Sequence, residues 1–183
     1  MKEIRIHGRG GQGSLVLAQF MAIAALWDGK YGQAFPYLGG GGERRGKPIV
    51  AFFRLSDNPI RVRSRITTPD YVIVQDPTIV GEIDIEEGLK PGGMVLINTE
   101  KSIGELKLKT PNVFAISADQ LARRILGRPI INTALLGTFA SMSGEISLQA
   151  SIQAVQSRFP GELGVKNARV VEESYRAFKM EAA

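Results

Sequence analysis

The chain of 183 residues contains no cysteine and a single histidine, His7. Without cysteine it has no disulfide, no thiol nucleophile, no thiolate metal site and no cysteine-ligated iron–sulfur cluster. A single histidine excludes a multi-histidine metal site and leaves a Ser-His-Asp arrangement only through His7. Most redox and hydrolytic machinery is therefore missing from this chain, and we expect no catalytic residue and no metal ligand in it.

Long apolar runs are also missing. No run approaches the roughly 20 residues that span a bilayer, and the N-terminus opens with charge rather than with the regions of a signal peptide. We therefore expect a cytoplasmic protein with no membrane partner. The length and a hydrophobic content of 44% are those of one well-cored domain, residues 1–183.

A glycine-rich segment, residues 8–13, follows a strand-like stretch and precedes an apolar stretch at 15–27. A glycine turn between a strand and a helix lets the backbone approach a ligand closely, and the helix dipole favours an anion there. We expect a phosphate or carboxylate near residue 10. His7, at the end of the strand, is either a ligand contact or a strand-end histidine bonded to backbone, and we favour the second interpretation.

The same glycines fit the dinucleotide fingerprint G-x-G-x-x-G. That fingerprint requires an acidic residue at the end of the next strand, about 20 positions further on, to hold the ribose. Residues 30–38 contain no acid, and Asp28 stands where the first helix should be ending. The sequence therefore disfavours a nicotinamide or flavin site.

The net charge of +5 is unevenly distributed. Residues 1–65 hold 11 Lys and Arg against four Asp and Glu, residues 66–110 hold four against eight, and the remainder holds eight against six. The basic excess could meet a phosphorylated cofactor, an acidic partner surface or nucleic acid, and nucleic acid is disfavoured because no recognised binding motif accompanies the charge. Arg61, Arg63 and Arg65 alternate, which also fits a solvated strand edge.

The pattern of apolar residues and turn signals predicts a three-layer α/β/α domain with a mixed sheet, a glycine-rich first βα turn and a helical C-terminal third. We expect a first strand at 3–7, a helix from Ser14, its N-cap, to Trp27, and an antiparallel hairpin of 49–55 with 60–66 around a turn at 56–59. Further strands are expected at 71–75, 94–98 and 113–116, with short helices between 77 and 89. Helices are expected at 118–126, 132–142, 148–158 and 165–180.

Two other segments suggest binding. Arg44 and Arg45 follow four glycines, and two guanidiniums on such a loop suit a carboxylate, a phosphate or the acidic face of another subunit. The alternative is a solvated surface loop. Asn132 opens a predicted helix, where it is either an N-cap or a residue whose backbone faces a ligand.

An ordered set of motifs resembles one family along nearly the whole chain. The set comprises residues 8–13, Gln33-Ala34-Phe35-Pro36, Glu43-Arg44-Arg45-Gly46, the segment 60–66 with Arg63-Ser64, residues 69–77, residues 132–137, Arg158-Phe159-Pro160 and Lys166-Asn167. It resembles the gamma subunit of the 2-oxoacid:ferredoxin oxidoreductases, most closely their pyruvate and 2-ketoisovalerate branch. One departure is a longer glycine-containing stretch at 37–42, which leaves the placement of Arg44 and Arg45 open.

The resemblance implies a subunit, inactive alone, of an enzyme that oxidatively decarboxylates a 2-oxoacid to an acyl-CoA and reduces ferredoxin. It implies alpha, beta and delta (ferredoxin-like) subunits as partners, ferredoxin as an indirect one, and thiamine diphosphate and iron–sulfur clusters on those partners. We hypothesise that this chain completes the complex and lines the approach of coenzyme A, whose phosphates suit a glycine turn backed by arginines. The expected ligand-binding residues are Gly8, Arg9, Gly10, Gly11, Gln12, Gly13, Arg44, Arg45 and Asn132. A purely structural scaffold and a free-standing nucleotide-binding protein remain as alternatives.

Overall fold

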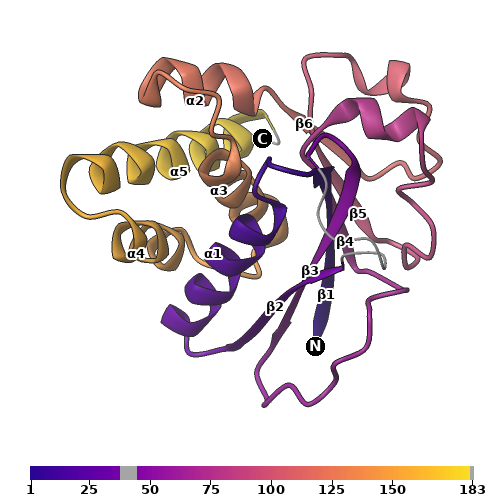
Figure 1. Cartoon of the computed structure of the whole chain (residues 1–183), viewed down its shortest axis with the longest axis horizontal. Helices are drawn as coiled ribbons and strands as arrows, with labels where there is room; N and C mark the ends of the chain where they lie inside the picture. Colours follow the sequence, from indigo (N-terminus) through magenta and orange to yellow (C-terminus); the bar gives the residue numbers. More distant parts are fainter. Residues whose placement is uncertain (38–44, 182–183) are drawn as a thin grey trace.

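The computed structural model describes residues 1–37 and 45–181. Its centre is a six-stranded sheet in the order β2-β3-β1-β4-β5-β6 (Figure 1). The strands are β1 (Lys2–Arg9), β2 (Tyr31–Tyr37), β3 (Pro48–Ser56), β4 (Tyr71–Val74), β5 (Met94–Asn98) and β6 (Val113–Ile116). β1, β4, β5 and β6 are parallel, whereas β3 runs antiparallel to both β1 and β2. The predicted mixed sheet is confirmed.

The helices lie on one face of the sheet (Figure 1). They are α1 (Ser14–Trp27), α2 (Ala118–Leu126), α3 (Asn132–Ser143), α4 (Leu148–Arg158) and α5 (Gly161–Glu181). α3 is buried from Asn132 through Ala140, because α1, α4 and α5 pack around it. The larger hydrophobic core lies between these helices and the sheet and includes Ile4, Ile6, Leu17 and Phe139.

A smaller core covers the other face of the sheet. It contains Val72, Val74, Val95 and Ile97 from the sheet, with Ile79 and Ile85 from the segments above it. These segments include the short 3₁₀ helices η1 (Pro77–Gly81) and η2 (Ile103–Leu106). The two cores on opposite faces explain why β4 and β5 read as continuous apolar runs in the sequence. They also confirm the predicted α/β fold.

The predicted hairpin of 49–55 with 60–66 is wrong. Residues 60–66 form no strand, and residues 61–65 are exposed. Both edges of β3 are already hydrogen-bonded, one to β1 and the other to β2, so no position remains for a third partner. The partner on the outer side, β2, was not predicted, because Gly32 and Pro36 weaken its strand signal. Proline is tolerated there because β2 is an edge strand.

No helix among the described residues has the length and hydropathy required to cross a membrane.

Candidate functional site

The glycine turn lies at the carboxyl end of β1, where the chain enters α1. Gly10 donates from its backbone N–H to the carbonyl of Lys47 over 2.9 Å, and its own carbonyl accepts from Gly46 over 3.0 Å. Gly10 also forms a bridge with Arg45. The turn and residues 45–47 therefore form one surface, although 35 positions of sequence separate them.

Two of the glycines are required by the packing of this chain. A Cβ at Gly8 would lie 2.4 Å from both the Gln75 Oε1 and the Ser14 Oγ atoms. Gly13 has a φ of 79°, and a Cβ there would lie 2.7 Å from the Asn132 Nδ2 atom. Gly13, rather than the predicted Ser14, is the N-cap of α1, and no side chain in the described part of the structure caps that helix. The N-terminus of α1 therefore presents backbone rather than side chain.

A buried chain of amide groups lies behind the turn. The Ser14 hydroxyl donates to Gln75 Oε1 over 2.5 Å, and Gln75 Nε2 donates to Asn132 Oδ1 over 2.7 Å. Asn98 Nδ2 donates to the Gln75 carbonyl over 3.0 Å and to Asp119 Oδ2 over 2.7 Å. These bonds join α1, the end of β4, the end of β5, α2 and α3, so this network holds the polar groups at the carboxyl edge of the sheet.

An ion-paired cluster holds the other side of the turn. The Arg9 guanidinium binds Glu82 and Thr78, and its Nε lies 3.3 Å from Asp76 Oδ2. Gln12 Nε2 donates to Asp76 Oδ2 over 2.9 Å, and Gln12 Oε1 accepts from the Arg9 N–H. Burial opposes ionisation of Asp76, yet the hydrogen bonds from Thr78 and Gln12 and the charge of Arg9 together keep the pKa of its carboxyl below the usual value. The Arg9 guanidinium is therefore committed to carboxylates of its own chain.

A pocket of about 690 Å³ opens between these groups. Its lining includes Gln12, Gln75, Asn98 and Asn132, the carboxylates of Asp76 and Asp119, and the exposed Arg123. Two further hollows of about 690 and 680 Å³, one beside β6 and one beside η1 and η2, contain none of the glycine turn. Ligands of open parallel sheets bind outside the carboxyl ends of the strands, and this pocket lies at that edge.

His7 lies outside the lining of this pocket. It is 4% exposed, and its Nε2 accepts from Arg5 Nε over 3.0 Å. Burial, and secondarily the charge of Arg5, lower its pKa to about 3, so the ring is neutral at physiological pH. Its Nδ1 atom has no partner among the described residues. The favoured interpretation of His7, a strand-end histidine bonded to backbone, is therefore wrong in its partner, because the ring is bonded to the Arg5 side chain.

The structure brings most of the predicted site residues together. Gly8–Gly13 form the turn, Arg45 lies beside it, and Asn132 lines the pocket as the first residue of α3 rather than as its N-cap. Arg44 lies outside the described residues. Sequence reasoning missed Gln75, Asn98 and Asp119 as pocket residues and Lys47 as a neighbour of the turn. For Gln75 and Asn98 a signal existed, because each is a polar residue at the carboxyl end of a buried apolar strand.

A sequence model of the pyruvate ferredoxin/flavodoxin oxidoreductase family matches residues 3–178. The chain belongs to this family. One of its curated relatives, the pyruvate/ketoisovalerate oxidoreductases common subunit gamma of Thermococcus kodakarensis, is 46% identical over 179 residues, which covers 96% of each protein.

Proteins of known structure share the fold. Pyruvate oxidoreductase subunit PORC from Thermotoga maritima superposes with a TM-score of 0.83 at 35% identity, over 96% of this chain and 95% of that one. The 2-oxoglutarate:ferredoxin oxidoreductase from Magnetococcus marinus, solved with 2-oxoglutarate, coenzyme A and succinyl-CoA bound, gives a TM-score of 0.79 at 20% identity. That match covers 98% of this chain and 31% of the other, so the same fold also occurs as part of a longer chain.

Proposed function

We propose that this chain is the gamma subunit of a multisubunit 2-oxoacid:ferredoxin oxidoreductase that acts on pyruvate or a branched-chain 2-oxoacid. Family membership and 46% identity over 96% of a common gamma subunit support this assignment. The chain has no cysteine, and the described residues contain no cluster of His, Asp and Glu that could hold a metal ion. The lack of cysteine leaves the chain without ligands for an iron–sulfur cluster. We assign thiamine diphosphate, which supports decarboxylation, and the iron–sulfur clusters, which accept the electrons, to the alpha, beta and delta subunits.

Within that complex, the pocket at the glycine turn is the region of this chain that approaches coenzyme A. The observation that carries this proposal is the N-terminus of α1, which no side chain of the described residues caps and which borders a pocket of about 690 Å³ whose lining includes amide side chains. This volume falls within the range of roughly 300–1,000 Å³ typical of ligand sites. A helix N-terminus favours the phosphates of such a ligand, and amide side chains offer both donors and acceptors to its nucleoside end.

The charges around the pocket suggest how such a ligand would lie. Asp76 and Asp119 line the pocket, so a phosphate deep inside would meet like charge. Arg45 and Lys47 are exposed on the outer side of the turn. We therefore assign the phosphates to the mouth of the pocket, between the N-terminus of α1 and this rim, rather than to its interior. Arg9, paired with Asp76 and Glu82, positions the turn.

The two alternatives make different predictions. A purely structural subunit would use the glycine turn and Arg45 only to pack against a neighbour, and coenzyme A would not respond to changes there. A free-standing nucleotide-binding protein needs an acid for the ribose at the end of the second strand. Asp28 accepts instead from the Ser147 N–H and hydroxyl at the start of α4, and β2 lies at the edge of the described sheet, beside β3. The structure disfavours that alternative.

Affinity copurification under anaerobic conditions tests the subunit assignment. A tagged chain should recover thiamine- and cluster-bearing subunits, and the eluate should reduce a viologen with a 2-oxoacid in a coenzyme A-dependent reaction. Recovery of the chain alone would reject the assignment.

A double variant tests the ligand assignment in the assembled enzyme. Arg45→Gln with Lys47→Gln should raise the KM for coenzyme A about tenfold, since it removes charged donors to phosphate. The control, Lys107→Gln with Arg158→Gln, removes two exposed charges elsewhere and should leave that KM unchanged. An unaltered KM in the first variant would favour the purely structural role.

A further inference from the structure

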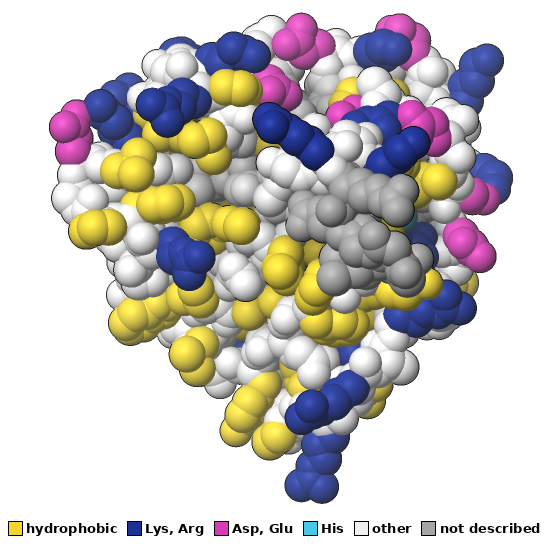
Figure 2. Space-filling model, viewed as in Figure 1, with side chains coloured by type: hydrophobic (Ala, Val, Ile, Leu, Met, Phe, Trp, Pro, Cys, Tyr) yellow, Lys and Arg dark blue, Asp and Glu magenta, His cyan; other side chains and the backbone are white. Residues whose placement is uncertain are grey.

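The segment between β3 and β4 carries three arginines, Arg61, Arg63 and Arg65, which we call the arginine row. All three are exposed, and none has an ion pair or side-chain hydrogen bond among the described residues. The only acid in residues 57–68 is Asp57. In Figure 2, Lys and Arg side chains project at the lower tip of the molecule, where this segment runs in Figure 1. Within the described part of the chain, the row is therefore a local excess of positive charge without an ion-pair partner.

A buried arginine holds the segment in place. Arg54 on β3 is 1% exposed, and it donates to the Val62 carbonyl over 3.3 Å and to the Ser64 carbonyl over 2.7 Å. The two carbonyls alternate with the residues of the row, so the anchored backbone directs the charged side chains to solvent. Ile66, 2% exposed, fixes the far end of the segment.

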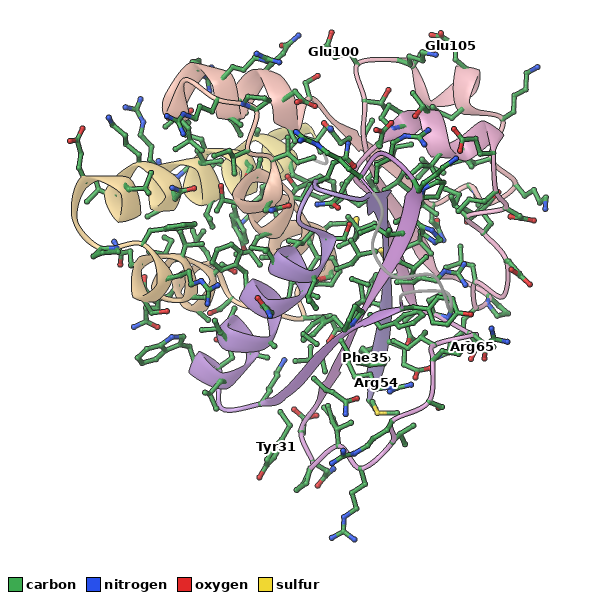
Figure 3. All side chains as sticks on the ribbon, in the orientation of Figure 1. Tyr31, Phe35, Arg54, Arg65, Glu100 and Glu105 are labelled. Atoms are coloured by element: carbon green, nitrogen blue, oxygen red, sulfur yellow. The ribbon has the colours of Figure 1, made fainter. Side chains whose placement is uncertain are left out.

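Arg54 itself is fixed by the sheet. Its Nε donates to Glu3 Oε1 over 2.9 Å and its Nη1 to Gln33 Oε1 over 3.1 Å, and its guanidinium lies 5.1 Å from the centre of the Phe35 ring. The register pairs Arg54 with Glu3 on β1 and Gln33 on β2, so these side chains share one face. Figure 3 shows Arg54 beside Phe35, with Arg65 at the rim of the molecule. The row is thus presented from a rigid support, which lowers the entropy lost when a partner binds.

From this geometry we infer that the arginine row docks a carboxylate-rich surface of another subunit of the same oxidoreductase. The three arginines stand at alternate positions of a segment that forms no helix or strand, and three separate guanidiniums suit a series of carboxylates better than one phosphate group. None of the three arginines lines a described pocket, which also argues against a small ligand.

The surroundings of the row favour a permanent subunit over a transient electron carrier. Val62 lies within the row and is 44% exposed, and Met1 and Tyr31 are about half exposed. The strand register brings Met1 and Tyr31 next to the end of β3, where this segment begins. Exposed aromatic, methionine and arginine side chains together are typical of stable protein interfaces. The inference rests on the proposed subunit role and adds the surface and the chemistry of its partner.

The test uses the assembled complex. The other subunits are coproduced with the wild-type chain, with Arg61→Gln, Arg63→Gln, Arg65→Gln, or with a control that removes three exposed charges elsewhere: Lys107→Gln, Arg158→Gln, Lys179→Gln. Dissociation on dilution is followed by mass photometry over a series of salt concentrations. A third variant replaces the three arginines of the row by lysine, which keeps the charge.

We expect the glutamine variant of the row to raise the dissociation constant about 30-fold, from three contacts each worth about threefold, and to weaken the salt dependence. The control and the lysine variant should stay within a few-fold of wild type. Unchanged dissociation of the glutamine variant would overturn the inference, as would equal weakening of the control or of the lysine variant. A change only in the KM for coenzyme A or for the electron acceptor would also overturn it, by assigning the row to that ligand. Failure of the wild-type chain to assemble would instead reject the subunit role itself.

Discussion

Gln75 is the side chain on which the polar network at the pocket depends, and Gln75→Leu tests that dependence. Gln75 is 1% exposed and joins the Ser14 hydroxyl, which is fully buried, to the amide of Asn132. Leucine occupies a similar volume and keeps the backbone bonds of residue 75, to His7 and Asn98, in place. The substitution therefore removes two side-chain hydrogen bonds with little change in packing.

The expected loss in the free energy of unfolding depends on whether Ser14 and Asn132 can find another hydrogen-bond partner. A buried polar group without its partner costs about 1–3 kcal/mol. Ser14 has no access to water, whereas Asn132 lines the pocket and can exchange Gln75 for solvent. We expect a loss of about 3 kcal/mol in the free energy of unfolding, which corresponds to a fall of about 6–12 °C in Tm for a chain of this length.

Urea unfolding of wild type, Ser14→Ala, Gln75→Leu and the double variant measures the coupling. Alanine at position 14 removes the hydroxyl that Gln75→Leu leaves unpaired. The loss in the free energy of unfolding of the double variant should therefore be smaller than the sum of the two single losses by about 1 kcal/mol or more. The reasoning is refuted if Gln75→Leu costs less than about 0.5 kcal/mol, or if the two losses are additive.

Three further predictions concern the surroundings of the site. Gly13→Ala should cost about 1–3 kcal/mol, because alanine is strained at a φ of 79° and its Cβ meets Asn132, whereas Gly81→Ala, with open space around it, should be neutral by the same urea titration. Arg54→Met should lower the free energy of unfolding by about 3–5 kcal/mol, because it leaves the Glu3 carboxylate unpaired. Limited trypsin digestion should also cut the variant faster than wild type at the arginine row. Equal digestion rates of variant and wild type would contradict the anchoring role. The pKa of His7 is lowered to about 3 in the folded chain, so as the pH falls below about 6.5 the unfolded chain takes up a proton that the folded chain does not. The free energy of unfolding should therefore decrease between about pH 6.5 and pH 3. In His7→Asn, the Tm from thermal unfolding should depend less on pH across that range. An unchanged pH dependence of Tm would show that His7 is not the group responsible.

Much of the fold could be predicted because its signals are local. The bounds of α2 and α4 follow from residues beside them in sequence: Gly127 ends α2, and the Ser147 hydroxyl accepts from the Ala150 N–H at the start of α4. The buried strands β4 and β5 are short apolar runs between turn residues. The pairing of β3 could not be predicted in this way. Residues 60–66 alternate between apolar and polar side chains after a turn-forming quartet, which fits a hairpin with β3 equally well. Only the position of β1 and β2 on the two edges of β3 excludes that hairpin.

The sequence by itself determined the absence of cysteine-based chemistry, the glycine turn before α1 and, through the order of its motifs, the family. Only the tertiary structure decided which side chains surround the turn. Gln75, Asn98 and Asn132 come from separate elements and meet because parallel strands end at one edge of the sheet. The roles of the arginines were also decided there, since burial and pairing depend on neighbours that are distant in sequence. Arg54 became an anchor and Arg9 an ion-pair partner, while the arginine row remained exposed.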